Sequence, residues 1–266
     1  MRNSIVLLCV FFLGCQSDKK WAFDKKIMLP EETRPLGMAL VDEGLWVSDP
    51  DNNQVLRIDE SGSVLETISN LFRPMHIEAN HNKLFIPNFS NDTISVYANG
   101  KSESLFVEAE FDAPSGLSVQ EGLIAFADFY NHRVLLSKNG DVTQIGAEGR
   151  TDGLLFYPTD LKIYGDKIVV ADAYNNRVQI FSLDGAFVKV IGWQEEIRVA
   201  TGLDVFEDLI YVSDYYGNRV LIYDLEGTLI NILEGQFNKP TDVLVHSDKM
   251  YVANYGENSI SIFELF

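Results

Sequence analysis

Three residues whose side chains can bind a metal ion occupy equivalent places in a recurring segment of the sequence. They are His76, Asp160 and Asp242, and the same place in the other three copies holds Gly37, Gly116 and Gly202. One imidazole and two carboxylates suit a divalent ion, calcium or zinc, and the glycines between them are expected to leave room for an ion or ligand. A purely structural role is the alternative, with His76 hydrogen-bonded beside Arg73.

Aromatic residues form a second candidate site. They stand one or two positions after an Asp or Asn that ends an apolar run, and such runs recur along the sequence. The predicted ligand-binding residues are Arg73, Phe89, Phe129, Tyr174, Tyr215 and Tyr255. Such a surface suits a peptide, a sugar or another small ligand, and a local cation on an acidic protein can select an anionic group. In the alternative interpretation, these rings only pack between neighbouring sheets.

Both candidate sites fall at fixed positions within six internal repeats of the sequence. The first residues of successive repeats are 39 to 44 positions apart. The repeats begin at Arg34, Arg73, Ala113, Tyr157, Val199 and Lys239. Each continues with an apolar run that ends in Asp or Asn and, six positions later, a β-branched residue that opens a third strand. Glycine turns and a further alternating run follow in most copies. Four short strands repeated six times predict an all-β, six-bladed β-propeller over residues 21–266.

Closure of this propeller can also be predicted from the two ends of the chain. The last repeat stops after its third strand, and the segment 21–27 has the pattern of a fourth strand. We therefore expect the N-terminal strand to complete the last blade, which removes two exposed sheet edges.

The recurrent acidic residues indicate structure rather than catalysis, because a single active site would not need a near-copy in every blade. Asp49, Asp128, Asp172 and Asp214 are expected to bind backbone amides, and Arg133, Arg177 and Arg219 to pair with these acids. The segments 170–178 and 212–220, with their Asp-x-x-Asn-x-Arg-Val signature or a close variant, resemble NHL repeats. That resemblance covers about residues 20–266. It implies the propeller fold and leaves function open, because the family includes lyases, ligand-binding modules and protein- or RNA-binding domains. It also leaves the structural alternative open for the His/Asp set, because Asp and Gly are both ordinary at that position of NHL repeats.

The N-terminus carries a run of nine apolar residues, 5–13, which is too short to span a bilayer as a helix. Gly14 and Cys15 follow the run, and the segment resembles a bacterial lipoprotein signal. This resemblance implies a signal peptide over 1–14, lipidation of Cys15 and a tether over 15–20. The protein would then lie in the bacterial cell envelope, anchored to a membrane and facing the periplasm or the exterior. An ordinary cleaved signal with an incidental cysteine is the alternative.

The net charge of −18 disfavours nucleic acid as a partner, because an acidic surface repels phosphate. No Gly-x-Ser-x-Gly elbow is present, and Cys15 is the one cysteine left once residues 1–14 are removed. In a propeller the innermost strand of each blade lines a central channel, and the face where these strands begin is called here the channel mouth. The sequence therefore predicts a monomeric, non-catalytic module that binds a protein, peptide or small molecule through the face around the channel mouth. The alternative is a metal-dependent enzyme of the lyase or lactonase type that uses His76, Asp160 and Asp242.

Overall fold

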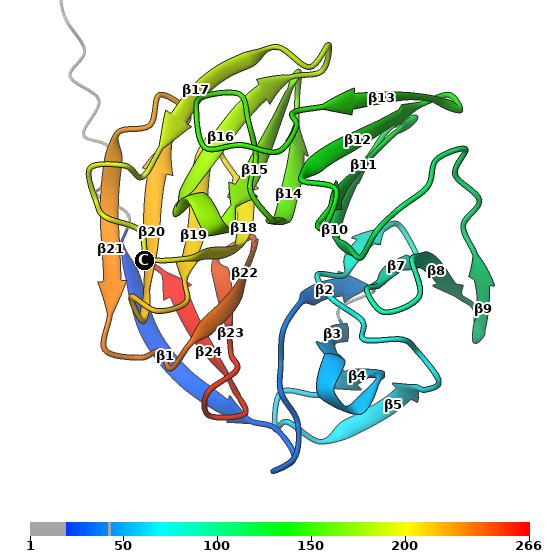
Figure 1. Cartoon of the computed structure of the whole chain (residues 1–266). Helices are drawn as coiled ribbons and strands as arrows, with labels where there is room; N and C mark the ends of the chain where they lie inside the picture. The colour runs from blue at the N-terminus through cyan, green and yellow to red at the C-terminus, as the bar shows by residue number, and fades with distance from the viewer. Residues whose placement is uncertain (1–19, 42–43) are drawn as a thin grey trace, which may run out of the picture.

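The computed structural model describes residues 20–41 and 44–266, and the predicted signal peptide and Cys15 lie outside this range. Strands β1 to β24 form six four-stranded antiparallel sheets around a central axis (Figure 1). The predicted six-bladed β-propeller is therefore confirmed. Helical structure in the described residues is confined to two short 3₁₀ turns, η1 (Pro50–Asn52) and η2 (Ala173–Asn175), and no helix there is long and apolar enough to cross a membrane.

The blades follow one another in chain order, and within each blade the strands run from the innermost to the outermost. Blade 1 is β2 (Met38–Val41), β3 (Gly44–Asp49), β4 (Gln54–Ile58) and β5 (Val64–Ile68). Blade 2 is β6 (Glu78–Asn80), β7 (Lys83–Asn88), β8 (Thr93–Ala98) and β9 (Lys101–Ser104). Blade 3 is β10 (Pro114–Gln120), β11 (Leu123–Asp128), β12 (Arg133–Lys138) and β13 (Asp141–Ile145). Blade 4 is β14 (Pro158–Tyr164), β15 (Lys167–Asp172), β16 (Arg177–Ser182) and β17 (Phe187–Ile191). Blade 5 is β18 (Ala200–Phe206), β19 (Leu209–Asp214), β20 (Arg219–Asp224) and β21 (Leu229–Glu234). Blade 6 is β22 (Pro240–His246), β23 (Lys249–Asn254), β24 (Ser259–Leu265) and β1 (Trp21–Met28).

The N-terminal strand closes the ring as predicted. Strand β1 pairs antiparallel with β24, from Trp21 opposite Leu265 to Met28 opposite Ser259. The backbone N–H of Lys20 also donates to the carbonyl of Phe266 at 3.0 Å. The first and last described residues are thus hydrogen-bonded to each other, and blade 6 gains its outermost strand from residues 21–28, far from β24 in the sequence.

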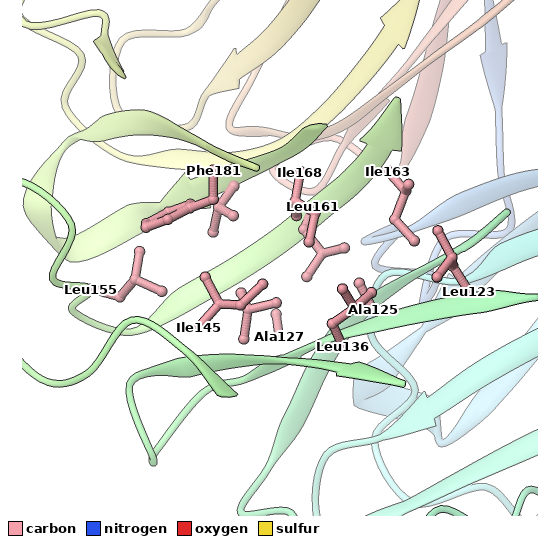
Figure 2. Close-up of a cluster of buried hydrophobic side chains, with 12 residues drawn as sticks. Leu123, Ala125, Ala127, Leu136, Ile145, Leu155, Leu161, Ile163, Ile168 and Phe181 are labelled. Atoms are coloured by element: carbon pink, nitrogen blue, oxygen red, sulfur yellow. The ribbon is translucent and has the colours of Figure 1, made fainter. Parts of the chain in front are cut away.

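The second strand of each blade is apolar because both of its faces are covered by neighbouring sheets. In β15 the side chains of Ile168 and Val170 pack toward blade 3, whereas Val169 and Ala171 pack toward blade 5. Alternate residues of a strand point to opposite faces, so a strand between two sheets must be apolar throughout. Figure 2 shows the layer between blades 3 and 4, where side chains from β11 to β16 interdigitate.

A left-handed residue just before each third strand joins neighbouring blades. The six residues have φ between 52° and 59°, and they are Asn53, Asp92, His132, Asn176, Asn218 and Asn258. The side chain of Asn53 accepts a hydrogen bond from the N–H of Arg73 at 2.8 Å, and that of His132 accepts one from Tyr157 at 3.0 Å. These bonds reach the segment that leads to the inner strand of the next blade, and they fix the loops around the channel mouth.

Candidate functional site

His76, Asp160 and Asp242 lie together where the inner strands of blades 2, 4 and 6 begin. One ligand atom from each side chain lies within 4.8 Å of the other two. The Nδ1 atom of His76 is 3.8 Å from Oδ2 of Asp160 and 3.7 Å from Oδ1 of Asp242. All three residues are buried, with His76 only 4% exposed. We call these three residues the upper layer of the channel.

The glycines between these residues do not leave free space as expected, because the neighbouring blade fills it. A Cβ at Gly116 would lie 2.8 Å from Oδ1 of Asp160, and one at Gly202 would lie 2.6 Å from Oδ1 of Asp242. A Cβ at Gly37 would meet the Cα of His76 at 2.6 Å. Backbone atoms of the next blade stand equally close, since the carbonyl oxygens of Thr159 and Thr241 would lie 2.8 and 2.5 Å from a Cβ at Gly116 and Gly202, so glycine is required at these positions.

Both aspartates also have a structural role that joins neighbouring blades. Oδ2 of Asp160 accepts a hydrogen bond from the N–H of Leu203 in blade 5 at 3.0 Å. Asp242 accepts one from Met38 in blade 1 at 2.7 Å and one from Val243 at 2.9 Å. These bonds match the structural alternative, and they also hold the carboxylates in fixed orientations.

His76 is the member of the layer that structure alone does not explain. Its Nδ1 atom is buried and has no hydrogen-bond partner among the described residues, since both carboxylates are too distant for a hydrogen bond. Burial lowers the pKa of the imidazole, but the charges of Asp160 and Asp242 outweigh burial, so the pKa of His76 is raised. An unpaired buried nitrogen facing two carboxylates marks a place where a positive charge is favoured.

A second ionic layer, which the sequence did not predict, lies two residues further along the inner strands. In this lower layer the Nζ of Lys162 from blade 4 donates to Oε2 of Glu78 from blade 2. Asp204 from blade 5 accepts hydrogen bonds from the N–H groups of Val245 at 2.7 Å and Val205 at 2.9 Å. Counting every second residue of the inner strands from His76, Asp160 and Gly202 would have found Glu78, Lys162 and Asp204.

Carboxylates outnumber cations in the two layers. Burial raises the pKa values of Glu78, Asp160 and Asp204. Burial also opposes the charge of Lys162, but the surrounding Glu78, Asp204 and Asp160 carboxylates raise its pKa overall. Four carboxylates thus face one ammonium and one imidazole in the described residues. If every group is charged, the channel keeps an uncompensated charge of −2, which favours binding of a further cation.

Aromatic side chains from blades 2, 3 and 4 form a continuous arc above the inner strands. The ring centroids of Phe89 and Phe129 are 5.3 Å apart, and those of Phe129 and Tyr174 are 6.2 Å apart. Tyr157, which was not among the predicted site residues, lies 4.8 Å from Phe129 and 4.9 Å from Tyr174. Tyr130 joins the arc beside Phe89 at 5.6 Å. We call these five residues the aromatic arc.

The other predicted aromatic residues form a separate pair in blades 5 and 6. The rings of Tyr215 and Tyr255 are 6.4 Å apart, and the hydroxyl of Tyr255 donates to Asp51 at 2.8 Å. Lys239 lies 5.8 Å from the centroid of the Tyr215 ring, as Arg73 lies 5.4 Å from that of Phe89. Each of the two predicted aromatic groups therefore has a cation beside it.

The recurrent Asp–Arg pairs form as expected and are structural. Arg177 Nε donates to Oδ2 of Asp172 at 2.8 Å, and the other oxygen of Asp172 accepts from the N–H of Phe156 at 2.7 Å. Asp128 with Arg133 and Asp214 with Arg219 repeat the pairing at 2.7 and 2.9 Å. Each pair fixes the segment leading to its inner strand, so these acids support the mouth.

Known proteins are similar to this chain mainly in fold. An alignment of 92 residues, which covers 32% of this chain, is 34% identical to the protein brain tumor of Drosophila melanogaster, but it spans only 9% of that protein. A gluconolactonase from Xanthomonas campestris has a TM-score of 0.73 at 15% identity, with 91% of this chain and 89% of that chain covered. A virginiamycin B lyase from Staphylococcus aureus has a TM-score of 0.67 at 12% identity, covering 94% and 100%. A chain of a nidogen–laminin complex has a TM-score of 0.65 at 19% identity, covering 77% and 81%.

These structural neighbours include enzymes and a protein that assembles with a partner, so the fold alone does not select a function. The family model for DUF5128, described as 6-bladed beta-propeller, matches residues 121–261, which is more than half of the sequence. The chain belongs to this family of six-bladed β-propellers.

Proposed function

We propose that the chain is an NHL-type, non-catalytic binding module, anchored in the bacterial envelope through Cys15, that takes a peptide segment on the face around the channel mouth. The observation that carries this proposal is the aromatic arc. Tyr130 is 50% exposed and Tyr174 is 55% exposed, although both contact further rings. Clustered exposed aromatic rings are typical of binding surfaces, since they offer a large contact area with little loss of conformational entropy.

The charges beside the arc favour a peptide that carries carboxylates. Arg73 lies against Phe89 at one end of the arc, and Arg150 lies 4.3 Å from the centroid of Phe156, which itself contacts Tyr157. Both arginine side chains belong to exposed residues on a protein with a net charge of −18. Two local cations on such an acidic surface attract an anionic group, while the arc takes an aromatic or aliphatic side chain of the same ligand.

The test is binding of the purified full chain to immobilised peptides that combine one aromatic residue with two or three carboxylates. Tyr174→Ala and Arg73→Ala are each expected to weaken binding, the tyrosine change by about 30-fold if it is a central contact. Phe187→Ala is the matched control, because this exposed ring lies in the same blade as Tyr174 but at the end of β16 and β17 opposite to the mouth. Equal binding by all variants, or no binding by the unmodified chain, contradicts the proposal.

The membrane anchor is tested separately, because it depends on residues outside the described range. Expression of the chain with radiolabelled palmitate is expected to label the protein and place it in the membrane fraction. Cys15→Ala is expected to abolish both, with Cys9→Ala as the control. Labelling that persists in Cys15→Ala would contradict lipidation at this residue.

A metal-dependent enzyme is the second candidate, and the unpaired Nδ1 of His76 is the observation that favours it. Two structural neighbours are a lyase and a gluconolactonase, so a gluconolactone is a suitable first substrate. Metal-dependent turnover that His76→Ala abolishes would favour the enzyme over the binding module. Absence of turnover with zinc, manganese or calcium would leave the binding module as the better description for this substrate class.

A further inference from the structure

We infer that the upper layer holds a divalent transition-metal ion, with zinc as the first choice, bound by Nδ1 of His76 and one carboxylate oxygen each from Asp160 and Asp242. This inference goes beyond the proposed peptide binding, because the aromatic arc does not require a metal. It also reaches beyond the sequence-based hypothesis, which left calcium and zinc equivalent and did not include the lower layer.

The two layers of the channel provide an internal comparison. In the lower layer two carboxylates, Glu78 and Asp204, face the ammonium of Lys162, which donates to Glu78. In the upper layer two carboxylates again face a common centre, but the third group is an imidazole whose Nδ1 has no hydrogen-bond partner in the described part of the chain. The lower layer therefore contains a permanent cation, whereas the positive charge of the upper layer depends on a proton on the His76 imidazole, and a metal ion can take the place of that proton at Nδ1.

The three donor atoms all lie within 4.8 Å of one another, which is somewhat wider than around a coordinated ion. A tetrahedral zinc site with bonds of about 2.0–2.1 Å has its ligand atoms about 3.3 Å apart. The Nδ1 of His76 is 3.8 Å from Asp160 and 3.7 Å from Asp242. Each of these two distances must shorten by about 0.5 Å to reach the tetrahedral separation, and His76 is the side chain to move, because its Nδ1 makes no hydrogen bond in the described residues.

The donor set selects a transition metal over calcium. Imidazole nitrogen is a common ligand of zinc, copper, nickel and iron, whereas calcium prefers six to eight oxygen ligands. Asp160 and Asp242 supply few oxygens, and each already accepts a backbone N–H from the next blade, Leu203 and Met38 respectively. Such hydrogen bonds orient carboxylate ligands and are a usual feature of metal sites.

The test is metal binding by the purified full chain after removal of metals with a chelator. Titration with zinc is expected to show one tight site per chain, with calcium bound much more weakly. His76→Ala should weaken zinc binding by at least about 100-fold, because it removes a direct ligand. His76→Ala removes no hydrogen bond of Nδ1 among the described residues, but it does remove the contacts of the imidazole with Asp160 and Asp242, so the fold of the variant is checked by circular dichroism. His246→Ala is the matched control, because His246 is an exposed histidine on inner strand β22 and lies outside the layer.

Cobalt provides a second measurement on the unmodified chain, which keeps the inference testable if a variant does not fold. Cobalt in a tetrahedral site with nitrogen and oxygen ligands is expected to give an intense visible absorption band that zinc displaces at one equivalent. Binding of zinc that is equal in His76→Ala, or that is lost in His246→Ala, would overturn the inference. Tighter binding of calcium than of zinc, or no stoichiometric binding and no cobalt band, would overturn it as well. Peptide binding is measured without metal, so failure of either proposal is distinguishable from failure of the other.

Discussion

Replacement of Lys162 by methionine is the sharpest test of the charge balance in the two layers of buried ionisable residues. Methionine keeps most of the apolar stem but removes the ammonium that bonds Glu78 and faces Asp204 and Asp160. The side chains of Lys162 and Glu78 are only 16% and 14% exposed, so water cannot replace the lost cation well. Removing one partner of a buried ion pair destabilises a protein by about 3–5 kcal/mol. With roughly 2–4 °C per kcal/mol for a domain of this size, we expect the midpoint of thermal unfolding to fall by roughly 6–20 °C.

Calorimetry in the presence of a chelator measures this effect without a contribution from bound metal. The double variant Lys162→Met/Glu78→Gln is expected to recover part of the loss, because the amide removes the carboxylate that the first change left unpaired. Glu78→Gln alone is the second single variant, and it completes a double-mutant cycle for the pair. A loss of less than about 1 kcal/mol in Lys162→Met would refute the charge argument. A double variant no more stable than Lys162→Met would refute it equally.

The destabilisation should also depend on pH in a defined direction. Burial already raises the pKa of Glu78, and loss of the Lys162 ammonium must raise it further. A carboxyl whose pKa is higher in the folded state stabilises the fold at low pH, and this stabilisation is lost as pH rises through the folded-state pKa. The difference between Lys162→Met and the unmodified chain should therefore be smallest near about pH 5 and largest near about pH 8.

Two further predictions concern the frame that holds the site. Gly116→Ala should destabilise the fold by about 1–3 kcal/mol in urea unfolding, because the new Cβ would lie 2.8 Å from Oδ1 of Asp160; unchanged stability would contradict this packing argument. Asp172→Ala should lower the free energy of unfolding by about 3–5 kcal/mol, because Arg177 is 3% exposed and loses the shorter of its two ion pairs, keeping only the pair with the exposed Asp152. Asp49→Ala should lower it by only about 1–3 kcal/mol, because the side chains that donate to Asp49 are neutral amides, and equal losses in both variants would refute the distinction.

The fold was predictable because its physical cause is repeated six times. A strand between two sheets must be apolar on both faces, and the left-handed residue before each third strand favours Asn, so both features recur with the period of the blade. Even the closing strand β1 could be assigned, since the last repeat lacked a fourth strand of its own. Repetition thus converts weak local signals into a reliable prediction of architecture.

The site was less predictable because it lies where the repeats differ. The grouping of His76, Asp160 and Asp242 followed from their equivalent places in the repeats, and the structure brings these three side chains together. The lower layer was not predicted, because Glu78 and Lys162 look like ordinary surface charges in the sequence. Only the direction of the inner strands shows that alternate residues of different blades face one another across the channel.

The geometry of the upper layer explains why a propeller with six similar blades has only three side chains at this level of its channel. Where an inner strand carries His or Asp at this level, a Cβ on the neighbouring glycine would lie within 2.6–2.8 Å of it. Side chains can therefore occupy only alternate blades, whatever their chemistry. Two residues further along the strands this restriction disappears, because Ala39, Ser118 and Leu244 stand there with Cβ atoms beside the charged residues. Steric crowding at the upper layer thus limits it to a three-residue set, and the identity of those three residues determines which ion or group it can bind.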